Sequence, residues 1–223
     1  ASMLTHKDLD WLPHGINRNV FKPVDRMFAR SGWGVRDDEV VIGCVMSNQE
    51  RKHWSTVMEA VARMKEQPRF WIHTDRLLGY WDINALACEY DLADRVIYEN
   101  RPLKDAEMAM RYSACDATVI ISGGEGFCYP VAESLACGTP CVTGAYGAQL
   151  ELTLEGVKPV TTRLETSHNA RRAVYDAVAV SAALSHAVAN GDREREEEKV
   201  AHLKWEHVGL EWRRWFRKGL EAK

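Results

Sequence analysis

The chain has 223 residues, of which 46% are hydrophobic and 27% are charged, a composition typical of globular proteins. Its formal net charge of −3 argues against nucleic acid as the main partner, because neutralising a phosphate backbone requires a basic face. No apolar run approaches the roughly 20 residues of a membrane span. The six cysteines include no C-x-x-C pair and the eight histidines show no ligand spacing. We therefore expect free thiols in a reducing compartment, the cytoplasm, and no metal site.

Strand-like and helix-like segments alternate along the whole chain. Apolar runs predict strands at Glu39–Val45, Arg69–His73, Arg95–Tyr98, Ala117–Ile121, from Pro140–Thr143 onward and at Val157–Thr161. Helical patterns cover Trp54–Gln67, Tyr80–Tyr90, Lys104–Cys115, Pro130–Cys137, Ala170–Asn190 and roughly Arg193–Lys218. This alternation predicts an α/β fold: a Rossmann-like, mainly parallel sheet with helices on both faces.

Local signals refine three of these elements. Thr56-x-x-Glu59 offers a capping box for the helix Trp54–Gln67. Residues 162–169 are expected to form a polar loop, and Gly191 is expected to close the alanine-rich helix that follows it. Trp205, Trp212 and Trp215 lie within eleven residues of the last helix, more tryptophan than a surface helix needs. Part of that stripe is expected to be an interface with a partner.

The stretch from Ala117 to Thr143 has the organisation of an anion-binding unit. A buried strand leads into the glycine-rich turn Ser122–Gly126, where small residues let the backbone approach a ligand. Pro130 suits the first turn of the next helix, and Gly138 suits its left-handed cap. The amino end of that helix then faces the carboxyl end of the strand, a place that attracts phosphate.

Two carboxylates, Glu125 in the turn and Glu133 in the helix, lie eight residues apart in this unit. An acid beside an anion site is better suited to accept hydrogen bonds from hydroxyls than to touch the anion, because like charges repel. A phosphate flanked by polyols describes a nucleotide sugar. The alternative interpretation is an ordinary strand–helix turn with two solvated glutamates.

The pattern Gly-Glu-Gly-Phe, Glu125-x7-Glu133 and Glu-Ser-Leu-Ala-Cys-Gly-Thr-Pro resembles the signature of retaining, metal-independent family 4 glycosyltransferases of GT-B fold. The resemblance implies that Glu125, with Gly126, Phe127 and Cys128, contacts the donor's sugar. It implies that Glu133 holds the ribose. A nucleotide-diphosphate sugar is then the substrate, and no cofactor or metal is required.

The same resemblance assigns the cations. In the family, an arginine and a lysine after the first strand clamp the diphosphate; Lys52 matches the lysine, whereas Ser47 stands where the arginine belongs. Arg51 is expected to supply the second cation, the alternative being a solvated loop pair. Asn100 and Arg101 follow the third strand, where family members contact the base. Arg101 either neutralises the diphosphate or lies on the surface.

Domain organisation also follows from the resemblance. Leu12-Pro13-His14-Gly15-Ile16-Asn17, with Phe21-Lys22-Pro23, resembles the segment linking the two GT-B domains. Residues 1–22 are thus expected to be a linker and residues 23–223 the donor domain, with the amino-terminal acceptor domain absent. Such a domain would bind a nucleotide sugar for hexosyl transfer to an acceptor hydroxyl, but transfer little alone. The alternatives are a nucleotide-sugar 2-epimerase, and a non-catalytic domain that binds a nucleotide or a partner protein through the tryptophan-rich helix.

Overall fold

The computed structural model describes residues 12–152, 159–160, 162–167 and 170–221. Within these ranges, six parallel strands form one sheet in the order β3-β2-β1-β4-β5-β6. In that order they are Val96–Glu99, Arg69–His73, Val41–Val45, Ala117–Ile120, Cys141–Gly144 and Pro159–Val160. The order reverses between β1 and β4, which is where ligands bind in open sheets of this kind. The predicted fold class is confirmed.

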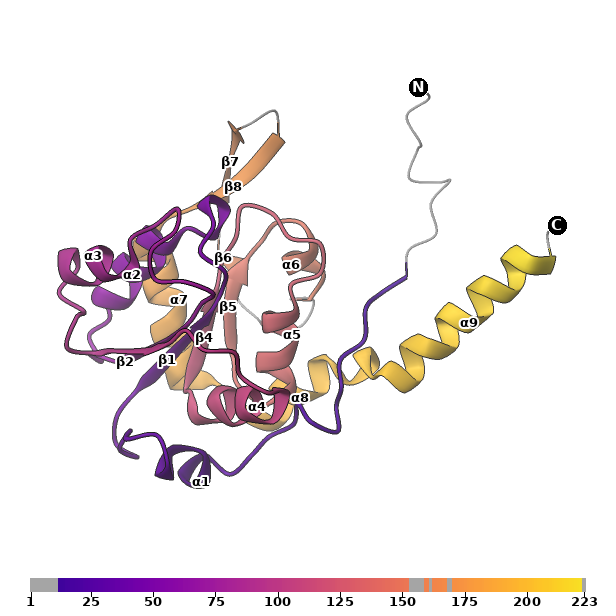
Figure 1. The fold of residues 1–223 in the computed structure, drawn as a ribbon, viewed down its shortest axis with the longest axis horizontal. Coiled ribbons are helices and arrows are strands. Elements are labelled where there is room, and N and C mark those ends of the chain that lie inside the picture. The colour runs from indigo at the N-terminus through magenta and orange to yellow at the C-terminus, as the bar shows by residue number, and fades with distance from the viewer. Residues whose placement is uncertain (1–11, 153–158, 161, 168–169, 222–223) are drawn as a thin grey trace.

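Helices cover both faces of the sheet (Figure 1). On one face, α7 (Ala177–Asn190) packs on β4 and β5 and against α2 (Trp54–Ala62), which contacts α3 (Ile83–Glu89). On the other face, α4 (Asp105–Ala114) and α5 (Tyr129–Ala136) pack on the sheet and on each other. Short α1 (Arg26–Ser31) and α8 (Arg193–Lys199) flank this second pair, contacting α4 and α5 respectively. The sheet is therefore buried on both sides, as its continuous apolar strands require.

The glycine-rich unit folds as predicted. All four residues of β4 are buried, and Pro130 lies in the first turn of α5. Gly138 has φ +72°, the left-handed conformation that glycine adopts without a steric penalty, and it follows the end of α5.

The structure corrects the predicted cap of helix α2 and the predicted start of helix α3. The predicted capping box at Thr56 is wrong: α2 begins at Trp54, and His53 stands before it in a left-handed conformation without a side-chain cap. Helix α3 begins at Ile83 because the Asp82 side chain accepts from the Ala85 amide. Gly191 follows the end of α7 at Asn190, as predicted, in an extended conformation with φ −66°.

The segment around residue 170 is the largest departure from the prediction. Instead of a loop and the start of a helix, β7 (Thr162–Ser167) and β8 (Ala170–Tyr175) form an antiparallel hairpin. Ala173 and Tyr175 are buried on one face, while Arg172 and Val174 on the other face are only partly buried, a period-two pattern typical of a strand. The alanine-rich helix begins only at Ala177, where Asp176 caps it.

The last predicted helix is also interrupted. Helix α8 ends at Lys199, a short 3₁₀ turn, η3 (Ala201–Leu203), follows, and α9 (Trp205–Glu221) projects away from the sheet (Figure 1). Val200 and Leu203 are buried, and the Leu203 carbonyl accepts a hydrogen bond from the Ile16 amide. The break therefore anchors the chain before α9 departs.

Candidate active site

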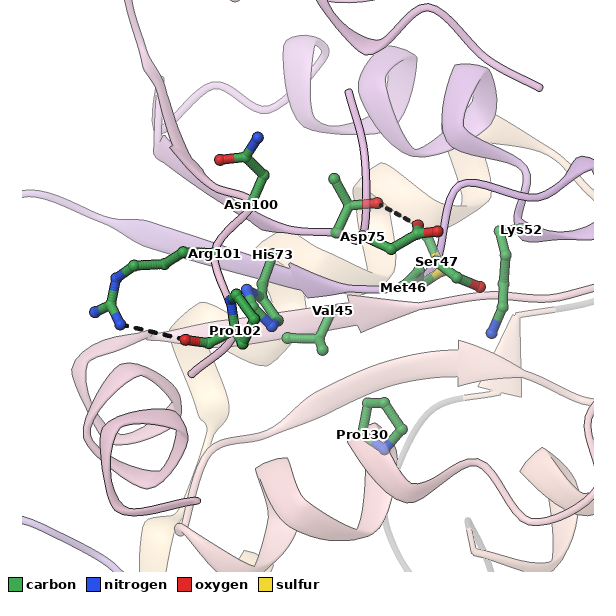
Figure 2. A pocket seen from close by; sticks show the side chains of 11 residues that line it. Val45, Met46, Ser47, Lys52, His73, Asp75, Asn100, Arg101, Pro102 and Pro130 are labelled. Carbon is green, nitrogen blue, oxygen red and sulfur yellow. Dashed lines mark hydrogen bonds between the residues drawn. The ribbon is translucent and has the colours of Figure 1, made fainter. Parts of the chain in front are cut away.

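A cavity of about 540 Å³ lies beyond the carboxyl ends of β1, β2 and β3. Its lining follows those three strand ends and includes one residue of α5: Val45, Met46, Ser47, Lys52, His73, Thr74, Asp75, Asn100, Arg101, Pro102 and Pro130. Figure 2 shows Lys52 directed into the space between the end of β1 and Pro130. Four of the residues predicted as site residues, Ser47, Lys52, Asn100 and Arg101, thus share one cavity.

Beside this cavity, one carboxylate oxygen of Glu125 accepts from both Lys52 Nζ and Arg51 Nη1. Arg51 also donates to Ser122 Oγ at 3.0 Å and to the Gly124 carbonyl at 2.8 Å. The Lys52 side chain is only 8% exposed and that of Glu125 10%. Two cations and one acid, from segments more than seventy residues apart, form a compact group with a surplus of positive charge.

Burial by itself would raise the pKa of Glu125. The hydrogen bond and charge of Lys52, with Ser122 and Arg51, outweigh burial and hold that pKa below its usual value. Glu125 is consequently ionised at neutral pH. An added anion would compete with Glu125 for the same two cations.

Glu133 lies in a different environment on α5. Its Oε2 accepts from the hydroxyl of the fully buried Tyr112 at 3.0 Å. Burial raises the pKa of Glu133 to about 7, against the lowering effect of the Tyr112 hydrogen bond. Glu133 is not among the residues lining the cavity, so the structure does not bring the two glutamates into one group. Its predicted role toward ribose stays a prediction.

This raised pKa has a consequence for stability. A carboxyl group whose pKa is higher in the folded than in the unfolded chain favours folding while it is protonated. Its contribution to stability is fully present below the unfolded-state pKa and is lost as pH rises through the folded-state pKa. We expect the stability of the wild type relative to Glu133→Gln to fall by roughly 2–3 kcal/mol from about pH 4 to about pH 8. Urea denaturation across this range measures it. Glu89→Gln, on the exposed surface of α3, should give a flat difference; an equally flat one for Glu133→Gln would refute the assignment.

The three predicted sugar-contacting residues continue from Glu125 into the start of α5. Nothing lies within 4 Å of the position that a Gly126 Cβ would occupy, so this backbone faces open space. The Phe127 ring packs against His14, with centroids 5.3 Å apart, and against Tyr129 at 4.9 Å. Cys128 is buried in a left-handed conformation, with φ +71°, which costs a non-glycine residue energy. Strain of this kind recurs at functional sites.

Arg101 does not join the cation group. It pairs with Glu99 and Glu107 at 3.2 and 2.9 Å, and its side chain is half-exposed. Figure 2 shows it bonded to the carbonyl of Pro102, its own neighbour. Arg101 nevertheless lines the cavity, so both interpretations of Arg101 stay predictions.

The sequence profile of the family described as "Glycosyl transferases group 1" matches residues 39–186, about two thirds of the chain, including the strands and loops above. The chain belongs to this family. Its sheet, its cavity and the Lys52–Glu125–Arg51 group are therefore features of a group 1 glycosyltransferase domain of GT-B fold.

Among curated relatives of this glycosyltransferase domain is a D-inositol 3-phosphate glycosyltransferase from Stackebrandtia nassauensis, 29% identical over 65% of this chain and 35% of that protein. One of the same name from Geodermatophilus obscurus is 31% identical over 67% of this chain and 35% of the relative. The chain thus spans about a third of the length of these relatives.

Solved structures show the same fold. Sucrose-phosphate synthase from Thermosynechococcus elongatus superposes with a TM-score of 0.79 at 24% identity, over 95% of this chain and 53% of that one. Anabaena Alr3699/HepE, solved with UDP and glucose, superposes with a TM-score of 0.71 at 16% identity, over 92% of this chain and 56% of that one. The C-terminal domain of LpcC from Francisella tularensis superposes with a TM-score of 0.60 at 18% identity, over 89% of this chain and 98% of that one.

Several residues of this glycosyltransferase domain were missed by sequence reasoning. His73, Thr74 and Asp75 line the cavity, and their place at the end of a strand and directly after it was the available signal. Tyr175 and His53, which contact the glycine-rich turn and the hairpin, gave no local signal. Among the described residues no helix is long and apolar enough to cross a membrane, and no group of three His, Cys, Asp or Glu side chains could hold a metal ion.

Proposed function

We propose that this chain binds a nucleotide-diphosphate sugar in the cavity beyond β1–β3. The observation that carries the proposal is the pair of cations Arg51 and Lys52, held by Glu125 where the carboxyl edge of the sheet and the start of α5 converge. A buried lysine and a partly buried arginine beside a helix amino end suit a diphosphate. The solved relative of the same fold with UDP and glucose supports this choice of ligand class.

The proposed reaction transfers a hexosyl group to an acceptor hydroxyl with retention and without a metal ion. As the bond between the anomeric carbon and the diphosphate breaks, negative charge grows on the leaving phosphate. Lys52 and Arg51 stabilise that charge, a contribution typically worth about 10²–10³ in rate per donor group. Glu125 orients the sugar and Glu133 the ribose, which is a proximity effect. The retaining outcome rests on the Glu125-x7-Glu133 pattern.

The chain is further proposed to be the carboxyl-terminal half of a larger cytoplasmic enzyme. It spans about a third of its curated relatives, and a solved C-terminal domain of a group 1 protein matches over nearly its entire length. The acceptor would then bind on the other half or on a second polypeptide. The linker-like segment at residues 12–23 supports this arrangement, since Trp212 of α9 bonds to the Pro13 carbonyl at 2.9 Å.

Calorimetry tests the proposal. We expect one of UDP, GDP and ADP, and the corresponding sugar, to bind the 223-residue chain at micromolar to millimolar Kd, unaffected by a chelator. Hydrolysis and transfer assays on this chain should show little turnover, because the proposed acceptor half is not included in the assay. Absence of binding by all three nucleotides and their sugars would refute the donor-site assignment. Robust transfer by this chain alone would refute the half-enzyme interpretation.

A further inference from the structure

The hairpin β7–β8 contacts the candidate site at its base. It stands above the carboxyl edge of the sheet, close to the turn η2 (Glu50–Lys52) that carries the two cations (Figure 1). Arg172 of β8 pairs with Glu50 at 3.1 Å. A two-stranded hairpin is marginally stable in isolation, so these contacts at its base fix its position.

A single residue of β8 joins the two loops of the site. The Ala173 amide donates to the Gly123 carbonyl at 3.2 Å, in the glycine-rich turn. The Ala173 carbonyl accepts from His53 Nε2 at 2.8 Å, directly after Lys52. The Gly123 amide in turn donates to the Arg51 carbonyl at 2.7 Å. The backbone of β8 therefore sets the spacing between the cation turn and the turn that carries Glu125.

Tyr175 supplies a second connection from β8. Its hydroxyl donates to the Ser122 carbonyl at 2.6 Å, and its ring meets His53 edge-on at 5.3 Å. The ring lies directly over Gly144 of β5, where an added Cβ would be 2.0 Å from the hydroxyl. The Tyr175 ring fits here because Gly144 has no side chain. The buried hydroxyl thus holds the first residue of the glycine-rich turn.

The turn needs such connections because Gly123, Gly124 and Gly126 leave its backbone free to adopt many conformations. A site built from charged groups loses rate steeply when they move by about 1 Å. We propose that Tyr175 is a positioning residue, which, with Ala173 of β8, holds the Ser122–Gly126 turn so that Glu125 meets the donor sugar. The role toward the sugar rests on the proposed function; the hold on the turn does not.

Tyr175→Phe tests the inference, because it removes the hydroxyl and keeps the ring over Gly144. Two measurements are made on the 223-residue chain: hydrogen exchange of the amides of Gly123–Gly126 without ligand, and the Kd of a nucleoside diphosphate and of its glucose conjugate. The nucleotide is whichever of UDP, GDP and ADP the wild type binds. We expect exchange in the turn to accelerate about tenfold while the helices keep their rates. The ratio of the two Kd values should shift about fivefold to tenfold against the sugar conjugate.

Tyr90→Phe is the matched control, since its hydroxyl bonds to Ser55 Oγ at 2.9 Å between α2 and α3, apart from the turn. It should leave both measurements unchanged. Arg172→Gln removes the ion pair with Glu50 at the base of the hairpin. It should change both measurements in the same direction as Tyr175→Phe but by less. If Tyr175→Phe does not fold, Arg172→Gln decides the question.

Unchanged exchange in the turn, or acceleration spread evenly over the whole chain, would overturn the inference by showing at most a general structural role. A change in exchange without a change in the Kd ratio would overturn the part that concerns the sugar. If the wild type binds no nucleotide, the proposed function fails, while the exchange measurement still decides whether Tyr175 holds the turn.

Discussion

Lys52→Met should lower the affinity for nucleoside diphosphate about 10- to 100-fold, the usual worth of a charge-assisted hydrogen bond. The substitution keeps the aliphatic stem and removes a buried ammonium group that borders the cavity. In the complete enzyme, turnover should fall about 10²–10³-fold, because charge on the leaving phosphate loses one of its two donors. Calorimetry measures the first effect and steady-state kinetics the second. Lys65→Met, at an exposed position beyond α2, is the matched control and should change neither.

Lys52→Met should also destabilise the fold, because Glu125 would keep only Arg51 as a cationic partner. Stability and affinity can be separated with the double variant Lys52→Met, Glu125→Gln. It should recover much of the thermal stability, since no under-paired carboxylate remains buried, yet its affinity should stay below that of the wild type. If affinity returned together with stability, the effect of Lys52 on binding would be structural.

Glu125→Gln should have opposite effects on binding and on turnover. Its carboxylate offsets part of the charge of Arg51 and Lys52 in the free chain, so removing the carboxylate charge makes both cations more available. We expect nucleoside diphosphate to bind several-fold more tightly, roughly a 1 kcal/mol gain. Turnover of the complete enzyme should fall by about 10²-fold, because the group that orients the sugar is weakened. Calorimetry with nucleotide alone, and then kinetics, measures the two effects.

The control for Glu125→Gln is Glu59→Gln, which removes a carboxylate paired with the exposed Arg63 outside the cavity and should leave nucleotide affinity unchanged. Weaker nucleotide binding in Glu125→Gln would show that the carboxylate mainly aligns the cations rather than competing with the ligand. A covalent glycosyl adduct on Glu125, found by mass spectrometry, would contradict the orienting role and indicate a nucleophile.

Local patterns predicted most of the sheet. Strand β2 has the predicted bounds Arg69–His73, and β4 begins at the predicted Ala117. A strand buried on both faces is a continuous apolar run, which is visible without knowing its neighbours. The left-handed Gly138 was equally predictable, because its conformation is local.

The same local patterns failed where a partner decides the conformation. Ala170–Tyr175 has alanine and arginine enough for a helix, yet it pairs with Thr162–Ser167 and with the glycine-rich turn. The final helix broke around residues 200–203 because Val200 and Leu203 are buried and the Ile16 amide bonds to the Leu203 carbonyl. Tertiary context overrode helix propensity in both cases.

The sequence by itself determined the alternating α/β architecture. It also determined that Ser47, Lys52 and Asn100 lie at the same edge of the sheet, beyond the carboxyl ends of the strands. Parallel strands that follow helices must all end on the same side, so residues directly after those strands gather there. Only the tertiary structure decided that Glu125 pairs with Arg51 and Lys52, that Glu133 instead bonds to Tyr112, and that a hairpin joins the two loops. These contacts connect positions that are distant along the chain, and a hydrogen bond or ion pair between them leaves no periodic trace in the sequence.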